Sequence, residues 1–297
     1  MVLRWWPAAV PITLRYQWMK TTHAAASAPK KTEPYALLLR ILKRFPANAR
    51  KREADKPMEY SYQGRAPIFY ARVAGWIYLI AMALSLFTQM YVPGKIDVPH
   101  DASATAYNLS AFAGLYRTAI VVDILIFVSD VVIAWAFYEL LKGVDREIAL
   151  LGAFLRIADA AILTTATLWG VVALRLVSGL EYLQDIDSKE LAGLARLAIG
   201  IRGAGLYAGF VFLGAGSTVF AFLLFKSRLV PRLLPAWGMF ASPLLALGSL
   251  GTLLSPWFAA KLSMLAMLPM FFYEVPLGLW FVVKGVQVQG RFVAPTE

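Results

Sequence analysis

The sequence has 297 residues, of which 59% are hydrophobic and 16% charged, with a formal net charge of +11. A mean hydropathy of +0.61 excludes an ordinary soluble domain and is typical of an all-α, polytopic membrane protein. The absence of cysteine excludes disulfides, thiolate catalysis and iron–sulfur ligation. Only two histidines occur, in separate polar segments, so we expect no cofactor and no haem or di-histidine metal site.

Residues 1–70 are predicted to form a basic extension that does not cross the membrane. Fourteen Lys or Arg occur through Arg72, against four acids. Residues 34–46 are predicted to form a short interfacial helix, opened and closed by proline, with three basic residues on one face. The candidate partner contacts are three tryptophans and these basic residues: Trp5, Trp6, Trp18, Arg40, Lys43 and Arg44.

The start of the chain somewhat resembles an organelle presequence, but we favour an uncleaved basic tail. Its partners are expected to be membrane lipids or other membrane protein subunits. Nucleic acid is not expected, because the basic run at residues 50–52 adjoins a membrane helix.

Residues 71–297 are predicted to form a membrane domain of six transmembrane helices, since about 20 apolar residues span a bilayer. The predicted spans are residues 72–91, 117–141, 148–178, 203–225, 237–254 and 262–283. Asp187 followed by Glu190 resembles a capping box, and the amphipathic helix from there to residue 202 is expected to lie along the membrane surface. Gly205 and Gly209 have the spacing that lets a second helix approach closely.

The loop at residues 92–116 contains Asp97, His100 and Asp101, which are chemically able to bind a metal. They lack a repeat or a glycine scaffold, so we expect no metal site. Asn108 begins a formal glycosylation sequon, and a cap or turn role is the preferred interpretation.

The distribution of Lys and Arg predicts the orientation. Twenty-one of the 29 fall in the N-terminal segment, the 142–147 turn, the 226–232 loop and the C-terminal tail, whereas seven, Arg202 among them, fall on the opposite side. The positive-inside rule places both termini in the cytoplasm for a bacterial inner membrane protein, or in the matrix for a mitochondrial inner membrane protein.

Five charged residues fall inside the predicted spans: Asp123, Asp130, Arg156, Asp159 and Glu274. Charges in hydrocarbon are costly and are normally paired. Asp130 and Arg156 lie at similar depths beside the 142–147 turn, which predicts an ion pair between the second and third spans. Spacings of seven and three residues place Asp123 on the helix face of Asp130, and Asp159 beside Arg156, so one interface can hold these four.

The favoured role of this charge cluster is structural, with Arg156 holding the hairpin together. The alternative is a proton- or cation-coupled transporter, because four carboxyl groups face one arginine. A hydrolase would need a nucleophile, a histidine base or a metal set, and none accompanies these carboxylates.

The membrane region also carries several short motifs in a fixed order. They are Ala71-Arg72-Val73-Ala74-Gly75-Trp76-Ile77-Tyr78-Leu79, Leu115-Tyr116-Arg117, Phe154-Leu155-Arg156, Lys226-Ser227 with Pro231, and Glu274-Val275-Pro276-Leu277-Gly278-Leu279-Trp280. On these motifs, residues 71–286 resemble domain-of-unknown-function family 4386, a family of bacterial integral membrane proteins. The resemblance implies six spans in the cytoplasmic membrane and no known reaction. The basic extension departs from it.

These observations together predict a non-enzymatic membrane protein. We expect an accessory or structural subunit of a larger complex that docks through its N-terminal extension, with the transporter as the alternative.

Overall fold

The computed structural model describes residues 66–287, except for the side chains of residues 256, 259–264 and 266. This part is all-helical. Its elements are α4 (Pro67–Leu86), the π-helical turn η1 (Phe87–Tyr91), α5 (Val92–Ile96), α6 (Ala102–Ala111), α7 (Ala113–Leu141), α8 (Arg146–Leu176), the 3-10 turn η2 (Glu181–Leu183), α9 (Ser188–Ser227), α10 (Leu233–Leu254) and α11 (Pro256–Val283). The predicted interfacial helix and all six predicted partner contacts, from Trp5 to Arg44, lie outside the described residues.

Local sequence signals explain where these helices begin. Asp145 accepts a hydrogen bond at 3.2 Å from the backbone N–H of Ile148 and so caps α8. Asp187 caps α9 in the same way through the N–H of Lys189, at 3.1 Å. A side-chain oxygen at this position satisfies an N–H group that has no partner inside the helix.

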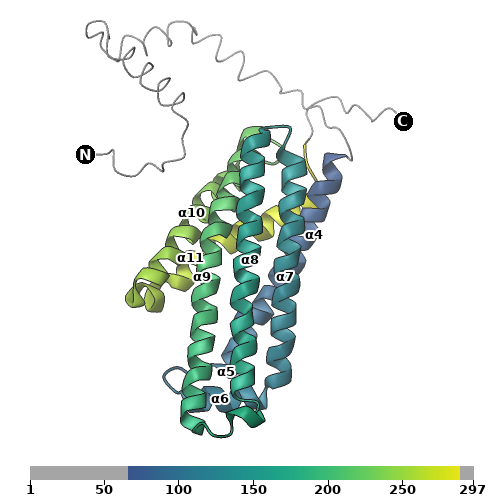
Figure 1. The fold of residues 1–297 in the computed structure, drawn as a ribbon. Helices are drawn as coiled ribbons and strands as arrows, with labels where there is room; N and C mark the ends of the chain where they lie inside the picture. Colours follow the sequence, from purple (N-terminus) through teal and green to yellow (C-terminus); the bar gives the residue numbers. More distant parts are fainter. Residues whose placement is uncertain (1–65, 288–297) are drawn as a thin grey trace, which may run out of the picture. The chain divides into compact units, whose positions relative to one another are not determined.

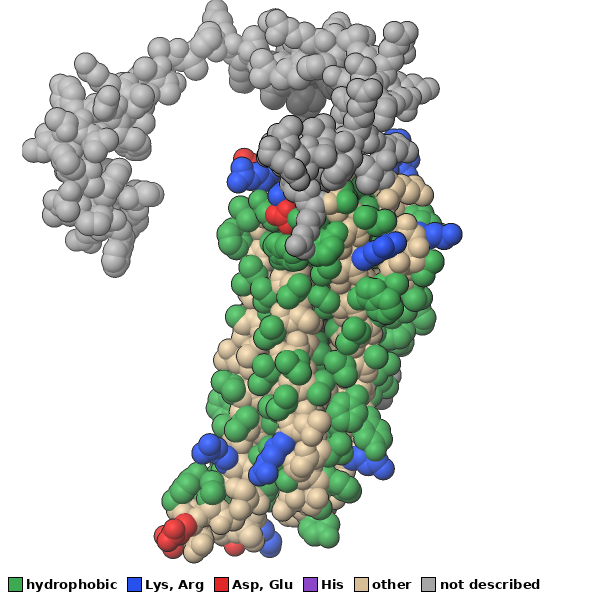
Figure 2. All heavy atoms as spheres, turned by 90° about the vertical axis from the view of Figure 1, so that its right-hand side faces the viewer, with side chains coloured by type: hydrophobic (Ala, Val, Ile, Leu, Met, Phe, Trp, Pro, Cys, Tyr) green, Lys and Arg blue, Asp and Glu red, His purple; other side chains and the backbone are tan. Residues whose placement is uncertain are grey.

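Five helical segments are long and apolar enough to cross a membrane. They are Pro67–Ile96, Ala113–Leu141, Arg146–Leu176, Ser188–Ser227 and Leu233–Leu254. The described apolar part of α11, Met267–Val283, is shorter. On the face shown in Figure 2, hydrophobic side chains cover the middle of the bundle and charged ones gather towards its two ends. This distribution fits a body surrounded by lipid.

The connections between the helices lie at one or the other end of the bundle (Figure 1). Lys226 and Asp145 form an ion pair at 3.8 Å, so the α7–α8 and α9–α10 turns share one end. The backbone N–H of Gln287 donates to the carbonyl of Leu229 at 2.8 Å, which brings the end of α11 there too. α5, α6 and η2 lie at the opposite end (Figure 1).

Helices α7, α8 and α9 run side by side as the longest part of the bundle (Figure 1). Gly205 and Gly209 of α9 face α8, and a Cβ added to Gly205 would lie 2.6 Å from the Cβ of Ala166. The predicted close approach of a second helix is therefore confirmed, with α8 as the partner.

Two predicted features were wrong. Residues 187–202 do not form a separate surface helix, since they continue without a break into the next span as the 40-residue α9. Buried alanines at positions 192, 195 and 198 pack this part of α9 into the bundle, which a helix lying on the membrane surface would not do. The predicted loop at residues 92–116 also contains two short helices, α5 and α6.

Candidate functional site: two buried arginine–carboxylate centres

The first polar centre inside the bundle consists of Arg156, Asp130, Asp159 and Glu274, and we call it the Arg156 centre. Asp130 on α7 and Arg156 on α8 lie at nearly equal distances from the turn that joins these helices. Arg156 Nη2 donates to Asp130 Oδ1 at 2.6 Å, and Arg156 Nη1 lies 3.4 Å from Asp159 Oδ2. Arg156 is 1% exposed and Asp159 0%, so the two carboxylates hold the arginine away from lipid.

This centre contains polar atoms without hydrogen-bond partners among the described residues. They are Nε and Nη1 of Arg156 and both carboxylate oxygens of Asp159. The 3.4 Å contact between Arg156 and Asp159 is an ion pair but does not have hydrogen-bond geometry. Buried oxygens of this kind are rare, because losing water without a replacement partner costs free energy.

Glu274 on α11 adds a third carboxyl group to the Arg156 centre. It is half-buried and interacts electrostatically with Arg156, but it forms no ion pair with a described residue. Asp130 and Asp159 therefore form ion pairs with Arg156, whereas Glu274 acts on it at longer range, so the centre contains more carboxyl groups than cations.

A second centre lies elsewhere in the bundle and consists of Arg202, Asp123 and Gln89, and we call it the Arg202 centre. Arg202 Nη2 on α9 donates to Asp123 Oδ2 on α7. Gln89 Nε2 donates to the other carboxylate oxygen, Oδ1, at 3.2 Å. Asp123 is 0% exposed, and these two hydrogen bonds satisfy both of its carboxylate oxygens.

Gln89 belongs to the π-helical turn η1, within the helical stretch that begins as α4. A π-helical turn inserts a residue into the helix and changes the direction of the side chains around it. The Arg202 centre therefore joins three segments that are far apart in the sequence, η1, α7 and α9.

Each buried arginine packs its aliphatic stem over a glycine of the neighbouring helix. A Cβ on Gly216 of α9 would lie 3.0 Å from Arg156 Cγ, and a Cβ on Gly170 of α8 would lie 3.4 Å from Arg202 Cδ. The relation is reciprocal, because α8 supplies the first arginine and the second glycine. The small residues thus make space for a long charged side chain between two close helices.

The helix spacings allowed Asp123 to share one interface with Asp130, Arg156 and Asp159, but the structure pairs it with a different arginine. Asp123 pairs with Arg202, because α9 extends far enough along α7 to reach it. Arg202 was predicted to end an amphipathic helix on the membrane surface, whereas its side chain is buried, with 8% exposed. The available signal was that the apolar face of residues 191–201 leads into the next span with no proline between them.

The polar residues of the former loop have structural contacts. Asp97 forms an ion pair with Arg196 at 3.3 Å, and Asp101 caps α6 through the N–H of Ala104 at 2.8 Å. Asn108 lies inside α6, and its amide is 3.5 Å from the carbonyl of Ile96. In the described part of the chain no three His, Asp or Glu residues are grouped as a metal site requires.

Comparison with known proteins assigns most of the chain to a family. Residues 73–285 match the model of the family described as Domain of unknown function (DUF4386). The chain belongs to this family. An uncharacterized protein of Archaeoglobus fulgidus is 30% identical to it over 166 residues, which is 54% of this chain and 80% of that protein. No solved structure matches the chain. Both buried centres lie within the part that matches DUF4386.

Proposed function

We propose that this DUF4386 protein is a non-enzymatic, six-span subunit of a larger complex in a cytoplasmic or mitochondrial inner membrane, with both termini on the positively charged side. The observation that carries the proposal is the use of the two buried arginines. Each is held by a carboxylate of a neighbouring helix, so the charges fasten α7 to α8 and α7 to α9.

A groove on the described surface lies at the start of α7 and the end of α8, and it is lined by residues 117, 120, 121, 171, 174, 175 and 178. These lining residues include none of the carboxylates of either centre. A transporter that uses these carboxylates needs a water-filled route to them, whereas a subunit needs a rigid body and a means of attachment.

The means of attachment that we propose is the N-terminal extension. Its composition supplies tryptophan and arginine, the residue types that most often anchor protein contacts. Basic residues next to a membrane helix also favour a position at an anionic membrane surface.

The test is co-purification in mild detergent of a tagged full-length chain and of a chain lacking residues 2–64. We expect the full chain to retain its partners and the truncated chain to lose them while still inserting in the membrane. Two further variants test individual basic residues. One replaces Arg40, Lys43 and Arg44 by glutamine. The control variant replaces Arg50, Lys51 and Arg52 by glutamine. Retention of the same partners after truncation contradicts the proposal.

The six-span topology has its own test, because the chain has no native cysteine. Single substitutions Arg50→Cys, His100→Cys, Asp185→Cys and Gly290→Cys are labelled from each side of the membrane. We expect positions 50 and 290 to react from one side, and 100 and 185 from the other. Opposite locations for 50 and 290 would rule out an even number of spans.

Proton- or cation-coupled transport is the second candidate function, and one observation favours it. Both oxygens of Asp159 lack a hydrogen-bond partner among the described residues, beside Asp130 and Glu274. The test reconstitutes the purified chain in liposomes and records proton movement under an imposed membrane potential. Transport predicts a flux that Asp159→Asn abolishes and that the exposed control Asp185→Asn leaves unchanged.

A further inference from the structure

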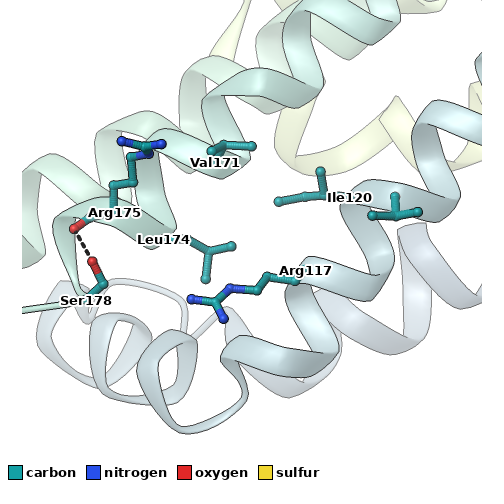
Figure 3. Close-up of a pocket in the computed structure, with 7 residues that line it drawn as sticks. Arg117, Ile120, Val171, Leu174, Arg175 and Ser178 are labelled. Carbon is teal, nitrogen blue, oxygen red and sulfur yellow. Dashed lines mark hydrogen bonds between the residues drawn. The ribbon is translucent and has the colours of Figure 1, made fainter.

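A surface groove of about 440 Å³ lies between the first turns of α7 and the last turns of α8. Figure 3 shows Arg117 and Ile120 of α7 on one side of it, and Val171, Leu174 and Arg175 of α8 on the other. Ser178 closes it beyond the end of α8, where its hydroxyl donates to the carbonyl of Arg175 at 2.8 Å. The groove therefore combines two cations and a hydroxyl with an apolar floor.

The two arginines of this groove are available to a ligand. Arg117 and Arg175 are exposed, and neither guanidinium forms an ion pair or a hydrogen bond with a described residue. The exposed arginines differ in this respect from Arg156 and Arg202, which carboxylates neutralise. A guanidinium presents a planar set of donors that matches a phosphate group.

The groove also stands at the height of a lipid headgroup. Arg117 and Arg175 lie roughly 35 to 45 Å along their helices from the α7–α8 turn, which is about the full thickness of a bilayer with its headgroups. Ile120 follows Arg117 along α7 and Val171 precedes Arg175 along α8, so the apolar part of the lining lies further from the helix ends than the arginines do. A ligand with a charged end and an acyl chain fits this order of polar and apolar surfaces.

We propose that this groove binds an anionic phospholipid, with its headgroup extending along Arg117 and Arg175 and an acyl chain against Ile120 and Val171. In the view of Figure 3, Leu174 stands between the two guanidinium groups, so they flank the groove and suit an extended headgroup better than a compact free phosphate. This site is separate from both buried centres, and it does not depend on the proposed role in a complex.

The test uses the purified full chain in a detergent that preserves lipid binding. Native mass spectrometry measures the fraction of protein that carries one added phosphatidylglycerol, phosphatidylcholine or glycerol 3-phosphate molecule. We expect phosphatidylglycerol to bind most tightly, because it has both the net negative charge and the acyl chains. Equal binding of phosphatidylcholine, or glycerol 3-phosphate binding as tightly as the lipid, overturns the proposal.

Substitutions assign the binding to the groove. Arg117→Gln with Arg175→Gln should weaken phosphatidylglycerol binding roughly thirtyfold, since each basic side chain near an anionic lipid contributes about fivefold. The control Lys95→Gln with Lys189→Gln removes the same charge from the same end of the bundle and should change binding by less than roughly threefold, because distant exposed charges are screened. An equal loss in the control overturns the proposal. If the double arginine variant does not fold, the single variants decide, each with an expected loss of about fivefold.

Discussion

The Arg156 centre and the Arg202 centre use the same chemistry with different balances of charge. At the Arg202 centre one guanidinium meets one carboxylate, and Gln89 satisfies the remaining oxygen of Asp123. At the Arg156 centre one guanidinium meets two carboxylates, and neither oxygen of Asp159 has a hydrogen-bond partner in the described residues. The Arg202 centre has the composition of a structural contact, whereas the Arg156 centre has one more carboxylate than its guanidinium neutralises.

This difference separates the two candidate functions. A balanced pair of buried charges links helices and has nothing left to exchange. A surplus of carboxyl groups in the membrane is the feature that proton- and cation-coupled proteins use. Variants that remove charges from each centre in turn therefore test both stability and function.

The largest effect is expected from Arg156→Leu, which leaves Asp130 and Asp159 buried without a cation. Breaking a buried ion pair by removing one partner costs about 3 to 5 kcal/mol. Unfolding in mixed detergent micelles of increasing SDS content measures the change in free energy. Arg146→Leu makes the same exchange on the exposed first residue of α8 and should change the stability by less than about 0.5 kcal/mol. Equal stability of the two variants would show that the Arg156 pair contributes nothing to folding.

The second largest effect compares the stability of single and double variants at the two centres. Asp123→Leu should destabilise the protein by about 3 kcal/mol, and adding Arg202→Leu should recover most of that loss, because no lone charge remains. The matched pair Asp130→Leu with Arg156→Leu should recover little, because Asp159 stays buried without a cation. The same SDS titration measures both cycles. Full recovery at the Arg156 centre would mean that its additional carboxylate carries no energetic cost.

The sequence predicted the Arg156 contact because both helices meet at one short turn. A tight turn fixes the relative depth of the residues on either side, so Asp130 and Arg156 could be matched by counting. All-helical architecture and family membership followed from hydropathy and from ordered short motifs.

The Arg202 contact could not be found in this way. Its partners are 79 residues apart, and their relative depth depends on how far α9 extends beyond the bilayer-length segment. Counting apolar residues predicted a surface helix that ends at residue 202 and a separate span at residues 203–225, because Arg196 and Arg202 interrupt the hydrophobic run. The direction of Gln89 depends on the π-helical turn η1, for which the sequence carries no simple signal.

Gln89→Leu is expected to have a smaller effect, confined to the Arg202 centre. It removes one of the two hydrogen bonds to Asp123, and a hydrogen bond to a charged group contributes about 1.5 kcal/mol or more. The free energy of unfolding should fall by about that amount. The control Thr118→Val removes a hydroxyl that bonds only to the carbonyl of its own helix and should be close to neutral. A neutral Gln89→Leu would indicate that Arg202 alone satisfies Asp123.

The smallest expected effect compares the two glycines under the arginines. Ala is favoured over Gly in a helix by up to about 1 kcal/mol, and this gain opposes the steric cost of the added methyl group. At Gly216 the new Cβ would lie 3.0 Å from Arg156 Cγ and 3.2 Å from Leu155 Cβ, so Arg156 must shift and its contact with Asp130 weakens. We expect Gly216→Ala to destabilise the protein by about 1 kcal/mol.

At Gly170 the contacts of a new Cβ are looser, at 3.2 Å from Tyr116 Oη and 3.4 Å from Arg202 Cδ. Gly170→Ala should therefore stay within about 0.5 kcal/mol of the natural protein, since the steric cost and the helix preference nearly cancel. Gly200→Ala is the control for the helix preference alone, because a Cβ at that position meets nothing within 4 Å. The SDS titration ranks the three variants. If Gly170→Ala is the more damaging exchange, the Arg202 centre is the more tightly packed of the two. If Gly216→Ala is the more damaging, as we expect, the Arg156 centre combines the tighter packing with the larger surplus of carboxyl groups.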